Sequence, residues 1–458
     1  MKPISQADID QLYKEQKAFF ASQKTLSVAF RKEQLRKLRK TILDHQNELE
    51  EAVWKDLRKS KEEFYITEIN VVITEIDFHL KNISHWSKPQ RVPSPYYLFP
   101  GKASVYHHPY GTSLIISPWN YPFQLLINPL VGAISSGCTA ILKPTPDSPH
   151  VSEVMQKMMD VTFESNYIAL IQGDIPINEM LLQKPFDLIF FTGSSRVGKI
   201  IMKAAAEHLT PVVLELGGKS PCIVDEGTHV DTAAKRILWG KITNAGQTCV
   251  APDYLLVHES VKEKLIGRMQ HHLRHMLGES IEKSPYYGRI INDRMFDRLA
   301  PLLKEGRVRI GGQSNKKDLY IAPTVLDEVP EQAACLQEEI FGPILPVISF
   351  KNIEEALARI NTHETPLAYY YFGSTRKGRK IIETSLSGGA CINDTLLHLG
   401  CQNLPFGGVG NSGTGNYHGY KSFLAFTHEK GVFENVKNID PPVRYAPFKY
   451  FPILKRLL

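Results

Sequence analysis

The sequence predicts an α/β protein built on a mostly parallel, doubly wound sheet, and three observations lead to this fold class. From Ser104 onward, short apolar runs alternate with segments long enough to form crossover helices. One of these runs leads through a glycine-containing turn into a helical stripe, an arrangement typical of the ligand-binding edge of such sheets. The length of 458 residues suggests about three structural units.

The composition is that of an ordinary globular protein. Apolar residues make up 43% of the chain and charged residues 22%, which excludes a disordered chain, a collagen-like repeat and a coiled-coil rod. The formal net charge of +6 is mild for this length. It is compatible with an anionic ligand, but it is not the concentrated basic face that predicts nucleic-acid binding.

The cysteines and the apolar stretches indicate a compartment. The six cysteines form no C-x-x-C pair and no zinc-type Cys/His spacing, so we expect free thiols, a reducing environment and no metal site. The first ten residues lack the pattern of a signal peptide, and prolines interrupt the most apolar stretch, Ser113–Ile134. We therefore expect a cytoplasmic protein without a transmembrane segment.

The first part of the chain, up to about residue 90, reads as helix. In Ala29–Leu57 the apolar residues recur mostly three, four or seven apart, which predicts one amphipathic helix. A second helix is expected over Phe64–Trp86, and the prolines in Pro89–Pro100 predict a connector.

Two series of strands follow this helical region. The first series is expected at Ser113–Ser117, Thr139–Lys143, Ile168–Gln172, Asp187–Phe191, Val212–Leu216 and Cys222–Val224. The second series predicts a second α/β domain, with strands at Tyr254–His258, Val325–Leu326, Leu345–Phe350 and Ala368–Phe372.

The turn after Asp187–Phe191 has features of a phosphate-binding site. It runs from Gly193 to Lys199 and opens a helix, whose free N–H groups and dipole attract anions. Two standard motifs nearly fit: Ile200 stands where a P-loop requires Ser or Thr, and only Gly193 and Gly198 match the dinucleotide pattern. From the motif alone, a tight connection without a ligand is an equal alternative, and a nucleotide hydrolase is a weaker one.

Three residues have the chemistry of a covalent active site. Cys249 lies among small and polar residues in a predicted loop, where a thiol can act as a nucleophile, although a lone cysteine is more often a buried hydrophobe. Glu215 ends an apolar strand, where burial would raise the pKa of its carboxyl and suit it to act as a base, unless it pairs with Lys219. Asn120 is an amide between two prolines, which predicts either a rigid oxyanion donor or an Asx turn.

Seven ordered motifs between residues 117 and 413 resemble those of the aldehyde dehydrogenase superfamily. They are Ser117–Phe123, Leu142–Pro144, Phe191–Gly198, Leu214–Pro221, Gly246–Cys249, Glu338–Pro343 and Leu404–Gly413. The segments Gly246–Asp253 and Asn403–Gly419 are similar to the class 3 branch, which acts on fatty and aromatic aldehydes. The resemblance implies a Rossmann-type cofactor domain, an α/β catalytic domain and a β oligomerisation arm.

The resemblance also implies a role for each site residue. Cys249 would attack the aldehyde to form a thiohemiacetal and then a thioester, Asn120 would stabilise the oxyanion, and Glu215 would activate the hydrolytic water. The cofactor would be NAD and/or NADP. The residues implied in its binding are Trp119, Lys143, Gly193, Ser194, Ser195, Arg196, Val197, Gly198, Leu216, Gly217, Glu339 and Phe341.

One departure from the family's pattern concerns cofactor choice. Many members carry a glutamate three residues after the counterpart of Lys143, where it binds ribose hydroxyls and disfavours a 2′-phosphate. Here that residue is Pro146. We therefore expect the chain to accept NADP as well as NAD, with Lys143 and Arg196 near the additional phosphate.

The resemblance predicts how the chain is divided. Residues 1–90 and 109–214 would form the NAD(P)-binding domain, 215–403 the catalytic domain, and 91–108 with 404–458 the oligomerisation arm and C-terminal tail. We expect a homodimer, whose aromatic and basic tail packs on the dimer or touches a membrane surface. Two functional alternatives stay open: acyl transfer to coenzyme A, and a non-catalytic protein that only binds the cofactor.

Overall fold

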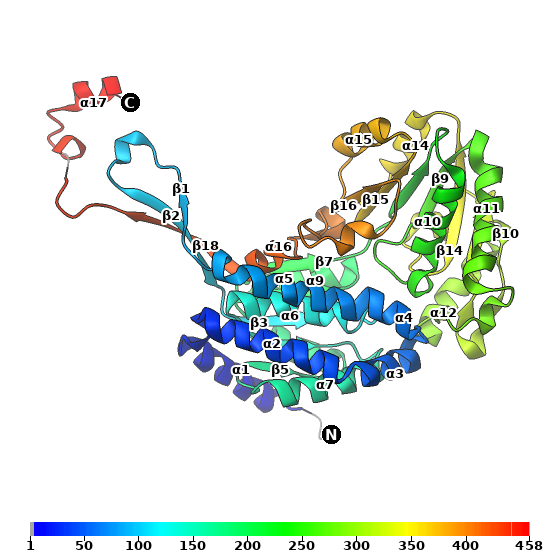
Figure 1. The fold of residues 1–458 in the computed structure, drawn as a ribbon, viewed down its shortest axis with the longest axis horizontal. Coiled ribbons are helices and arrows are strands. Elements are labelled where there is room, and N and C mark those ends of the chain that lie inside the picture. Colours follow the sequence, from blue (N-terminus) through cyan, green and yellow to red (C-terminus); the bar gives the residue numbers. More distant parts are fainter. Residues whose placement is uncertain (1–3, 441, 458) are drawn as a thin grey trace.

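The computed structural model describes residues 4–440 and 442–457. Two large sheets, each covered by helices, lie side by side, and a narrow three-stranded sheet projects from one end of the molecule (Figure 1). No helix within the described ranges is long and apolar enough to cross a membrane. Over the same residues, no group of three or more His, Cys, Asp or Glu side chains is placed to hold a metal ion.

The N-terminal region is helical as far as Trp86. Its elements are α1 (Gln6–Ala21), η1 (Lys24–Leu26), α2 (Val28–Asp44), α3 (Gln46–Leu57), α4 (Lys61–Phe64), the π-helical turn η2 (Tyr65–Ile69) and α5 (Asn70–Trp86). The single helix predicted over Ala29–Leu57 is wrong. His45 leaves helical geometry and its imidazole contacts the carbonyl of Thr41 at 3.0 Å, so α2 ends there and α3 begins at Gln46.

The six-stranded sheet has the strand order of a dinucleotide-binding fold. Its strands are β3 (Thr112–Ile116), β4 (Thr139–Lys143), β5 (Ile168–Leu170), β6 (Leu188–Thr192), β7 (Val212–Glu215) and the antiparallel edge strand β17 (Gly413–Thr414). In the order β17-β7-β6-β3-β4-β5, the chain winds outward from β3 to β5 and then returns to the other side of β3. β3 and β6 therefore meet at the switch point, where the carboxyl ends of parallel strands open a ligand crevice.

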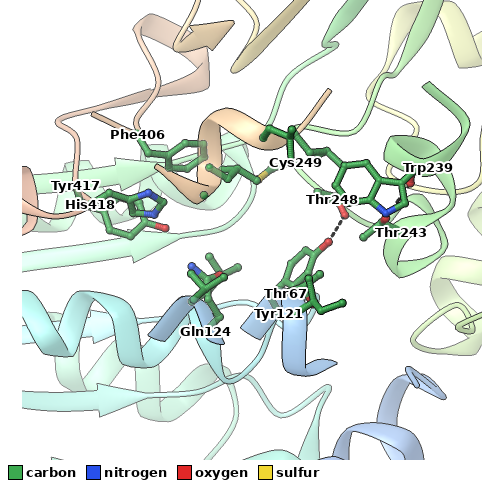
Figure 2. Close-up of a pocket in the computed structure, with 17 residues that line it drawn as sticks. Thr67, Tyr121, Gln124, Trp239, Thr243, Thr248, Cys249, Phe406, Tyr417 and His418 are labelled. Carbon is green, nitrogen blue, oxygen red and sulfur yellow. Dashed lines mark hydrogen bonds between the residues drawn. The ribbon is translucent and has the colours of Figure 1, made fainter. Parts of the chain in front are cut away.

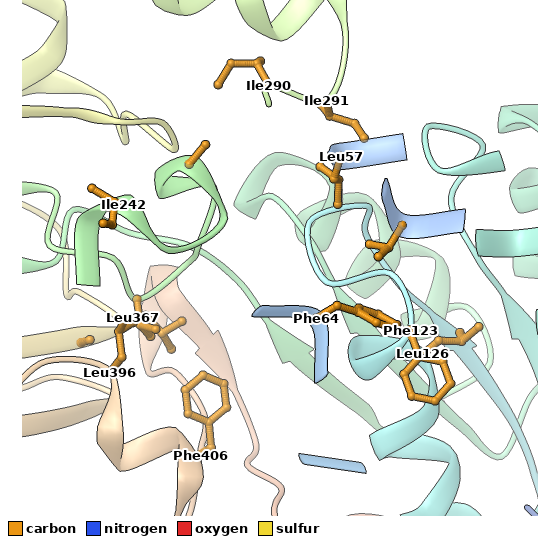
Figure 3. Close-up of a cluster of buried hydrophobic side chains, with 14 of the residues drawn as sticks. Leu57, Phe64, Phe123, Leu126, Ile242, Ile290, Ile291, Leu367, Leu396 and Phe406 are labelled. Carbon is orange, nitrogen blue, oxygen red and sulfur yellow. The ribbon is translucent and has the colours of Figure 1, made fainter. Parts of the chain in front are cut away.

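Helices cover both faces of this sheet. Ile115 belongs to the main core together with residues of α2, α6 (Gln124–Ser136) and α7 (Pro149–Thr162). Its neighbours Leu114 and Ile116 belong to the opposite core, with α1, α8 (Ile175–Leu182) and α9 (Ser195–Ala206). Burial on both faces explains why these strands are continuous apolar runs. Figure 3 shows part of the main core, where the rings of Phe64 and Phe123 meet edge to face at 6.2 Å.

The second large sheet has seven strands, of which only β10 runs antiparallel to its neighbour. Its strands are β8 (Pro221–Val224), β9 (Tyr254–His258), β10 (Arg307–Ile310), β13 (Thr324–Asp327), β14 (Ile344–Phe350), β15 (Ala368–Phe372) and β16 (Gly389–Ile392). Its helices are α10 (Val230–Ile242), α11 (Glu259–Leu277), α12 (Asp293–Leu299), α13 (Ala334–Gln337), α14 (Ile353–Ile360) and α15 (Thr375–Thr384).

The placement of Cys222–Val224 in the first series of strands is wrong. β8 lies inside the seven-stranded sheet, between β9 and β15. Gly217 and Gly218 carry the chain from one sheet to the other. A side chain at Gly218 would come within 3.3 Å of the backbone of Leu367, so this crossing requires a small residue.

The arm is an antiparallel sheet of β1 (Gln90–Val92), β2 (Lys102–Pro109) and β18 (Thr427–Glu434). Residues 404–426, which the sequence analysis assigned to the arm and tail, lie in the body instead: β17 pairs with β7, and α16 (Tyr420–Ala425) packs against α6. The tail ends in α17 (Phe451–Leu457), drawn beyond the arm in Figure 1. The remaining short elements are η3 (Tyr96–Leu98), η4 (Thr243–Gly246), η5 (Ile281–Lys283), η6 (Ala300–Lys304), β11 (Ser314–Asn315), η7 (Lys316–Asp318), β12 (Tyr320–Ile321), η8 (Leu397–Gly400), η9 (Gly410–Ser412) and η10 (Pro442–Arg444).

Candidate active site

Two cavities meet at Cys249. One, of about 210 Å³, is lined largely by apolar side chains and is called the apolar cavity here; its walls include Ile66, Leu125, Trp239, Leu396 and Phe406. The other, of about 660 Å³, opens at the carboxyl ends of β3 and β6 and is called the crevice; its walls include Trp119, Gly193, Arg196, Glu215, Glu339 and Phe341. Cys249 and Leu125 line both. Figure 2 shows Cys249 among the side chains of the apolar cavity.

The loop that carries Cys249 is held by an unusual backbone and by one glutamine. Asn244, Ala245 and Gly246 have φ values of 52°, 51° and 72°, three left-handed residues in succession. The Gln247 amide donates to the carbonyls of Asn244 (3.0 Å) and Arg289 (2.9 Å), and its oxygen accepts from the N–H of Ile291 (3.0 Å). A glycine and a glutamine before the cysteine therefore serve to shape the loop.

Burial and nearby acids control the protonation of the Cys249 thiol. Burial raises the pKa of Cys249 to about 12, and the negative charges of Glu339 and Glu215 contribute to the same shift. In this environment the thiol is protonated at neutral pH. Attack as a thiolate requires that a neighbouring group or water take the proton.

Asn120 lies directly against the Cys249 loop. Its side-chain Nδ2 donates to the backbone carbonyl of Gln247 at 3.0 Å, and the backbone carbonyl of Asn120 accepts from Asn244 Nδ2 at 2.7 Å. The Asn120 amide carries a second N–H, which an oxyanion beside Cys249 could accept.

Glu215 ends β7 and is buried, with 2% of its surface exposed. Within the described part of the chain neither of its carboxylate oxygens has a hydrogen-bond partner, and burial raises its pKa well above the usual range. The alternative of pairing with Lys219 does not occur, because Lys219 binds Asp253 and the carbonyls of Cys335 and Glu338. A buried carboxyl group at the crevice wall is suited to proton transfer.

Glu339 and Phe341 line the same crevice opposite β7. Burial raises the pKa of Glu339 to about 8, and the nearby charge of Asp253 adds to this shift. The carboxylate of Glu339 occupies the space that a side chain at Gly217 would need, which explains the glycine. The rings of Trp119 and Phe341 stand edge to face at 5.5 Å, so two aromatic groups line one end of the crevice.

The turn after β6 begins α9 at the crevice. Ser194 caps the helix by accepting from the N–H of Val197 at 3.4 Å, and Gly193, Ser194, Arg196 and Val197 line the crevice. Gly198 does not line it. A side chain at Gly198 would lie 2.7 Å from Leu216, so this glycine permits close packing of the helix against the chain after β7.

Two other predicted cofactor residues do not line the crevice and bond to backbone carbonyls instead. The hydroxyl of Ser195 donates to the carbonyl of Asn411 at 3.0 Å, which ties α9 to η9. The ammonium of Lys143 donates to the carbonyl of Pro144 at 2.7 Å and the side chain is buried, so burial lowers its pKa to about 8. Leu216 and Gly217, in contrast, line the crevice as expected.

The structure adds residues that sequence reasoning missed. Arg294, Arg298, Asp174 and Thr145 line the crevice, and Arg298 donates to the carbonyl of Glu339 at 3.2 Å. None of them stands in a motif with a recognisable spacing. Tyr121 lines the apolar cavity and lies inside the Ser117–Phe123 motif, so the signal for it was present.

Comparisons of the sequence and the structure with known proteins identify the family of this chain. A model of the aldehyde dehydrogenase family matches residues 1–432. The chain belongs to the aldehyde dehydrogenase family. The predicted resemblance and the predicted α/β fold are thereby confirmed.

Individual members of the aldehyde dehydrogenase family cover almost the whole chain. A Staphylococcus aureus protein named 4,4'-diaponeurosporen-aldehyde dehydrogenase is 48% identical over 444 residues, which is 96% of this chain and 97% of the relative. A mouse (Mus musculus) protein named aldehyde dehydrogenase, dimeric NADP-preferring, is 41% identical over 431 residues, covering 93% and 95%.

Solved structures agree with this family assignment. A substrate-bound state of Staphylococcus aureus AldH superposes with a TM-score of 0.96 at 46% identity, covering 98% of this chain and 99% of the other. An NAD+ complex of an aldehyde dehydrogenase from Bacillus cereus superposes with a TM-score of 0.86 at 26% identity, covering 95% and 90%.

Proposed function

We infer that this protein is an NAD(P)-dependent aldehyde dehydrogenase, in which an aldehyde in the apolar cavity and a nicotinamide cofactor in the crevice meet at Cys249. The observation that carries this assignment is that Cys249 lines both cavities. A thiol at that junction can bond to the aldehyde carbon from one side while the cofactor approaches from the other.

The side chains around the junction supply the remaining steps. Cys249 Sγ bonds to the aldehyde carbon, and the Asn120 amide with the Cys249 N–H holds the resulting oxyanion. NAD(P), when bound, supplies the hydride acceptor. Glu215 then takes a proton from the water that hydrolyses the thioester and releases the carboxylic acid.

The residues of the crevice fit a dinucleotide. The N-terminus of α9 presents backbone N–H groups and the positive end of the helix dipole beside Gly193 and Ser194. Pro146 lines the crevice at the position where many family members carry a glutamate, and Arg196 lines it too, alongside the carboxylates of Asp147 and Asp174. These two features support acceptance of NADP as well as NAD, as does the name of the mouse relative. Lys143 would have to turn out of its contact with Pro144 to take part.

The apolar cavity supports an apolar substrate of medium or long chain length, or an aromatic one. Its volume is about 210 Å³ and its walls are largely apolar, which suits an alkyl chain or an aromatic ring. Ile66 and Leu397 line this cavity and yet are 62% and 57% exposed, so they form its rim. A longer aldehyde would continue past the cavity across these two side chains.

We further propose a homodimer and a reducing, cytoplasmic location. The arm offers β-strand edges and exposed aromatic side chains to a second copy, and a relative carries the word dimeric in its name. All six cysteines are free thiols, and the proposed mechanism needs Cys249 reduced. The tail adds basic residues and about half-exposed aromatic ones, which supports peripheral contact with an anionic membrane surface.

Steady-state kinetics test the activity. Hexanal, tetradecanal and benzaldehyde are offered with NAD and with NADP, and the absorbance of the reduced nicotinamide is followed. We expect turnover with both cofactors and a free acid as product in the presence of coenzyme A. The Cys249→Ala variant should be inactive while retaining cofactor binding.

Three results would contradict the proposal. Turnover near wild type in the Cys249→Ala variant would refute the role of the thiol. Acyl-coenzyme A as product would favour the transferase alternative. A kcat/KM ratio above ~10³ for NAD over NADP, about 4 kcal/mol, would reject dual cofactor use.

A further inference from the structure

A buried ion pair lies directly beneath the loop that carries Asn120. Lys59 and Glu68 are both 0% exposed, and Lys59 Nζ lies 2.6 Å from Glu68 Oε1. A buried ion pair is a weak source of stability, because removing two charges from water costs about as much as their attraction returns. The role of the Lys59–Glu68 pair is therefore inferred from the groups that its two side chains contact.

The pair holds both ends of the segment from Asn120 to Gln124. Lys59 Nζ donates to the carbonyl of Asn120 at 3.2 Å and lies 4.2 Å from the centre of the Tyr121 ring. The second oxygen of Glu68 accepts from the N–H groups of Phe123 (3.0 Å) and Gln124 (3.2 Å), at the start of α6. The cation thus fixes the first residues of the segment and the anion fixes the last.

The same segment contacts the Cys249 loop at two points. The Tyr121 hydroxyl and Thr248 Oγ1 lie 2.6 Å apart, as Figure 2 shows, and Asn120 Nδ2 donates to the carbonyl of Gln247 at 3.0 Å. Displacement of this segment would therefore move the Asn120 amide relative to Cys249.

We propose that Lys59 and Glu68 are positioning residues, which hold the Asn120 amide at the distance from Cys249 that oxyanion stabilisation requires. Neither side chain lines the apolar cavity or the crevice, so both act through Asn120 and Tyr121. Glu68 lies on the π-helical turn η2, whose neighbouring residues Ile66 and Thr67 line the apolar cavity. The turn η2 thus supplies both residues that line the apolar cavity and the Glu68 carboxylate that holds the Asn120–Gln124 segment. π-helical turns occur frequently at functional sites.

The inference rests on the proposed role of Asn120, so the test is a double-mutant cycle between Glu68→Gln and Asn120→Ala. Asn120→Ala alone should lower kcat for hexanal by ~10²–10³-fold, the range found when one oxyanion donor is removed. Glu68→Gln should lower kcat by roughly tenfold or more in the wild-type background, and by less than about twofold in the Asn120→Ala background. The KM for NAD should change much less than kcat in Glu68→Gln, because neither Glu68 nor Lys59 lines the crevice.

Two further variants control for damage to the fold. Lys59→Met combined with Glu68→Gln removes both charges of this pair, and it should show the same loss of kcat. Asp327→Asn breaks another ion pair, in which a buried Asp327 lies 2.6 Å from a partly buried Lys262. Within the described residues this pair bonds to neither loop. It should leave kcat near wild type.

Equal losses from Glu68→Gln in both backgrounds would overturn the inference, because they would show general damage rather than positioning of Asn120. Wild-type kcat in the Lys59→Met, Glu68→Gln variant would overturn it as well. If Asn120→Ala alone is fully active while Cys249→Ala is inactive, the proposed role of Asn120 fails and takes this inference with it.

Discussion

Two buried acids set the charge around the nucleophile. Burial raises the pKa of Glu215 well above its usual range and that of Glu339 to about 8. Glu339 is therefore largely protonated near neutral pH, and the raised pKa of Glu215 acts in the same direction, so both shifts reduce the negative charge beside the Cys249 thiolate. As the pH rises through about 8, Glu339 ionises and opposes formation of the thiolate.

Glu215→Gln should separate the two halves of the reaction. The variant keeps the shape of Glu215 but cannot accept a proton, so we expect acylation of Cys249 to proceed and hydrolysis of the thioester to slow by about 10²-fold or more, the range typical of a lost general base. Intact-mass spectrometry of enzyme mixed with aldehyde and NAD should show an acyl adduct on the variant.

The rate of thioester hydrolysis should also depend on pH in a defined direction. Because burial raises the pKa of Glu215, its basic form increases over a pH range above that of an ordinary carboxyl group, and hydrolysis of the wild-type thioester should accelerate as the pH rises through that range. That rise should disappear in Glu215→Gln. Absence of an adduct, or an unchanged pH profile, would assign the base to another group such as Glu339.

At the scale of elements, the π-helical turn η2 contributes to the site from the N-terminal region. Its residue Ile66 and the residue Leu397 of η8 come from opposite ends of the chain and meet at the rim of the apolar cavity. Since exposed apolar side chains gain from being covered, a long aldehyde would be favoured by contact with them.

Ile66→Ser should therefore change chain-length preference. We expect kcat/KM for tetradecanal to fall by roughly fivefold, from a loss of about 1 kcal/mol of apolar contact, with hexanal unaffected. Val161→Ser, at an exposed apolar position of α7 that lines neither cavity, is the matched control. Equal losses for both aldehydes would show that Ile66 does not contact the distal part of the substrate.

At the scale of the whole molecule, two segments extend outside the body: the three-stranded arm and the C-terminal tail that follows β18. β18 pairs with β2 over eight residues, from Thr427 to Glu434, whereas the tail beyond it exposes aromatic side chains. The arm projects from the body in Figure 1. The two segments therefore suit different partners: the arm a second copy, the tail a lipid surface.

Two truncations test these partners separately. A chain ending at Val436 should stay dimeric in sedimentation velocity but lose flotation with vesicles rich in anionic lipid. It lacks five basic residues, each worth about 1 kcal/mol near such a surface. A chain ending at Phe426 also lacks β18 and should become monomeric. A dimer without β18 would reject the arm as the interface, and vesicle flotation independent of the tail would reject its membrane contact.

The sequence by itself determined three features: the strands of both large sheets that are long apolar runs, the loops that carry Cys249 and Asn120, and the strand end that carries Glu215. These features depend on local requirements that leave a local trace: burial on both faces of a strand, three left-handed residues before Cys249, or a glycine that admits Leu216. β10, β16 and β17 were missed. β10 alternates charged residues with apolar ones, β16 begins with glycine, and β17 has only two residues, Gly413 and Thr414.

Only the tertiary structure decided which of these local pieces meet. β8 joins the seven-stranded sheet, the buried ammonium of Lys143 bonds to the carbonyl of Pro144, and Lys59 and Glu68 reach the segment that carries Asn120. Each of these outcomes depends on contacts between residues distant in the chain. Periodicity and motif spacing describe neighbours along the sequence, whereas strand pairing and buried charge pairing are selected by the free energy of the complete fold.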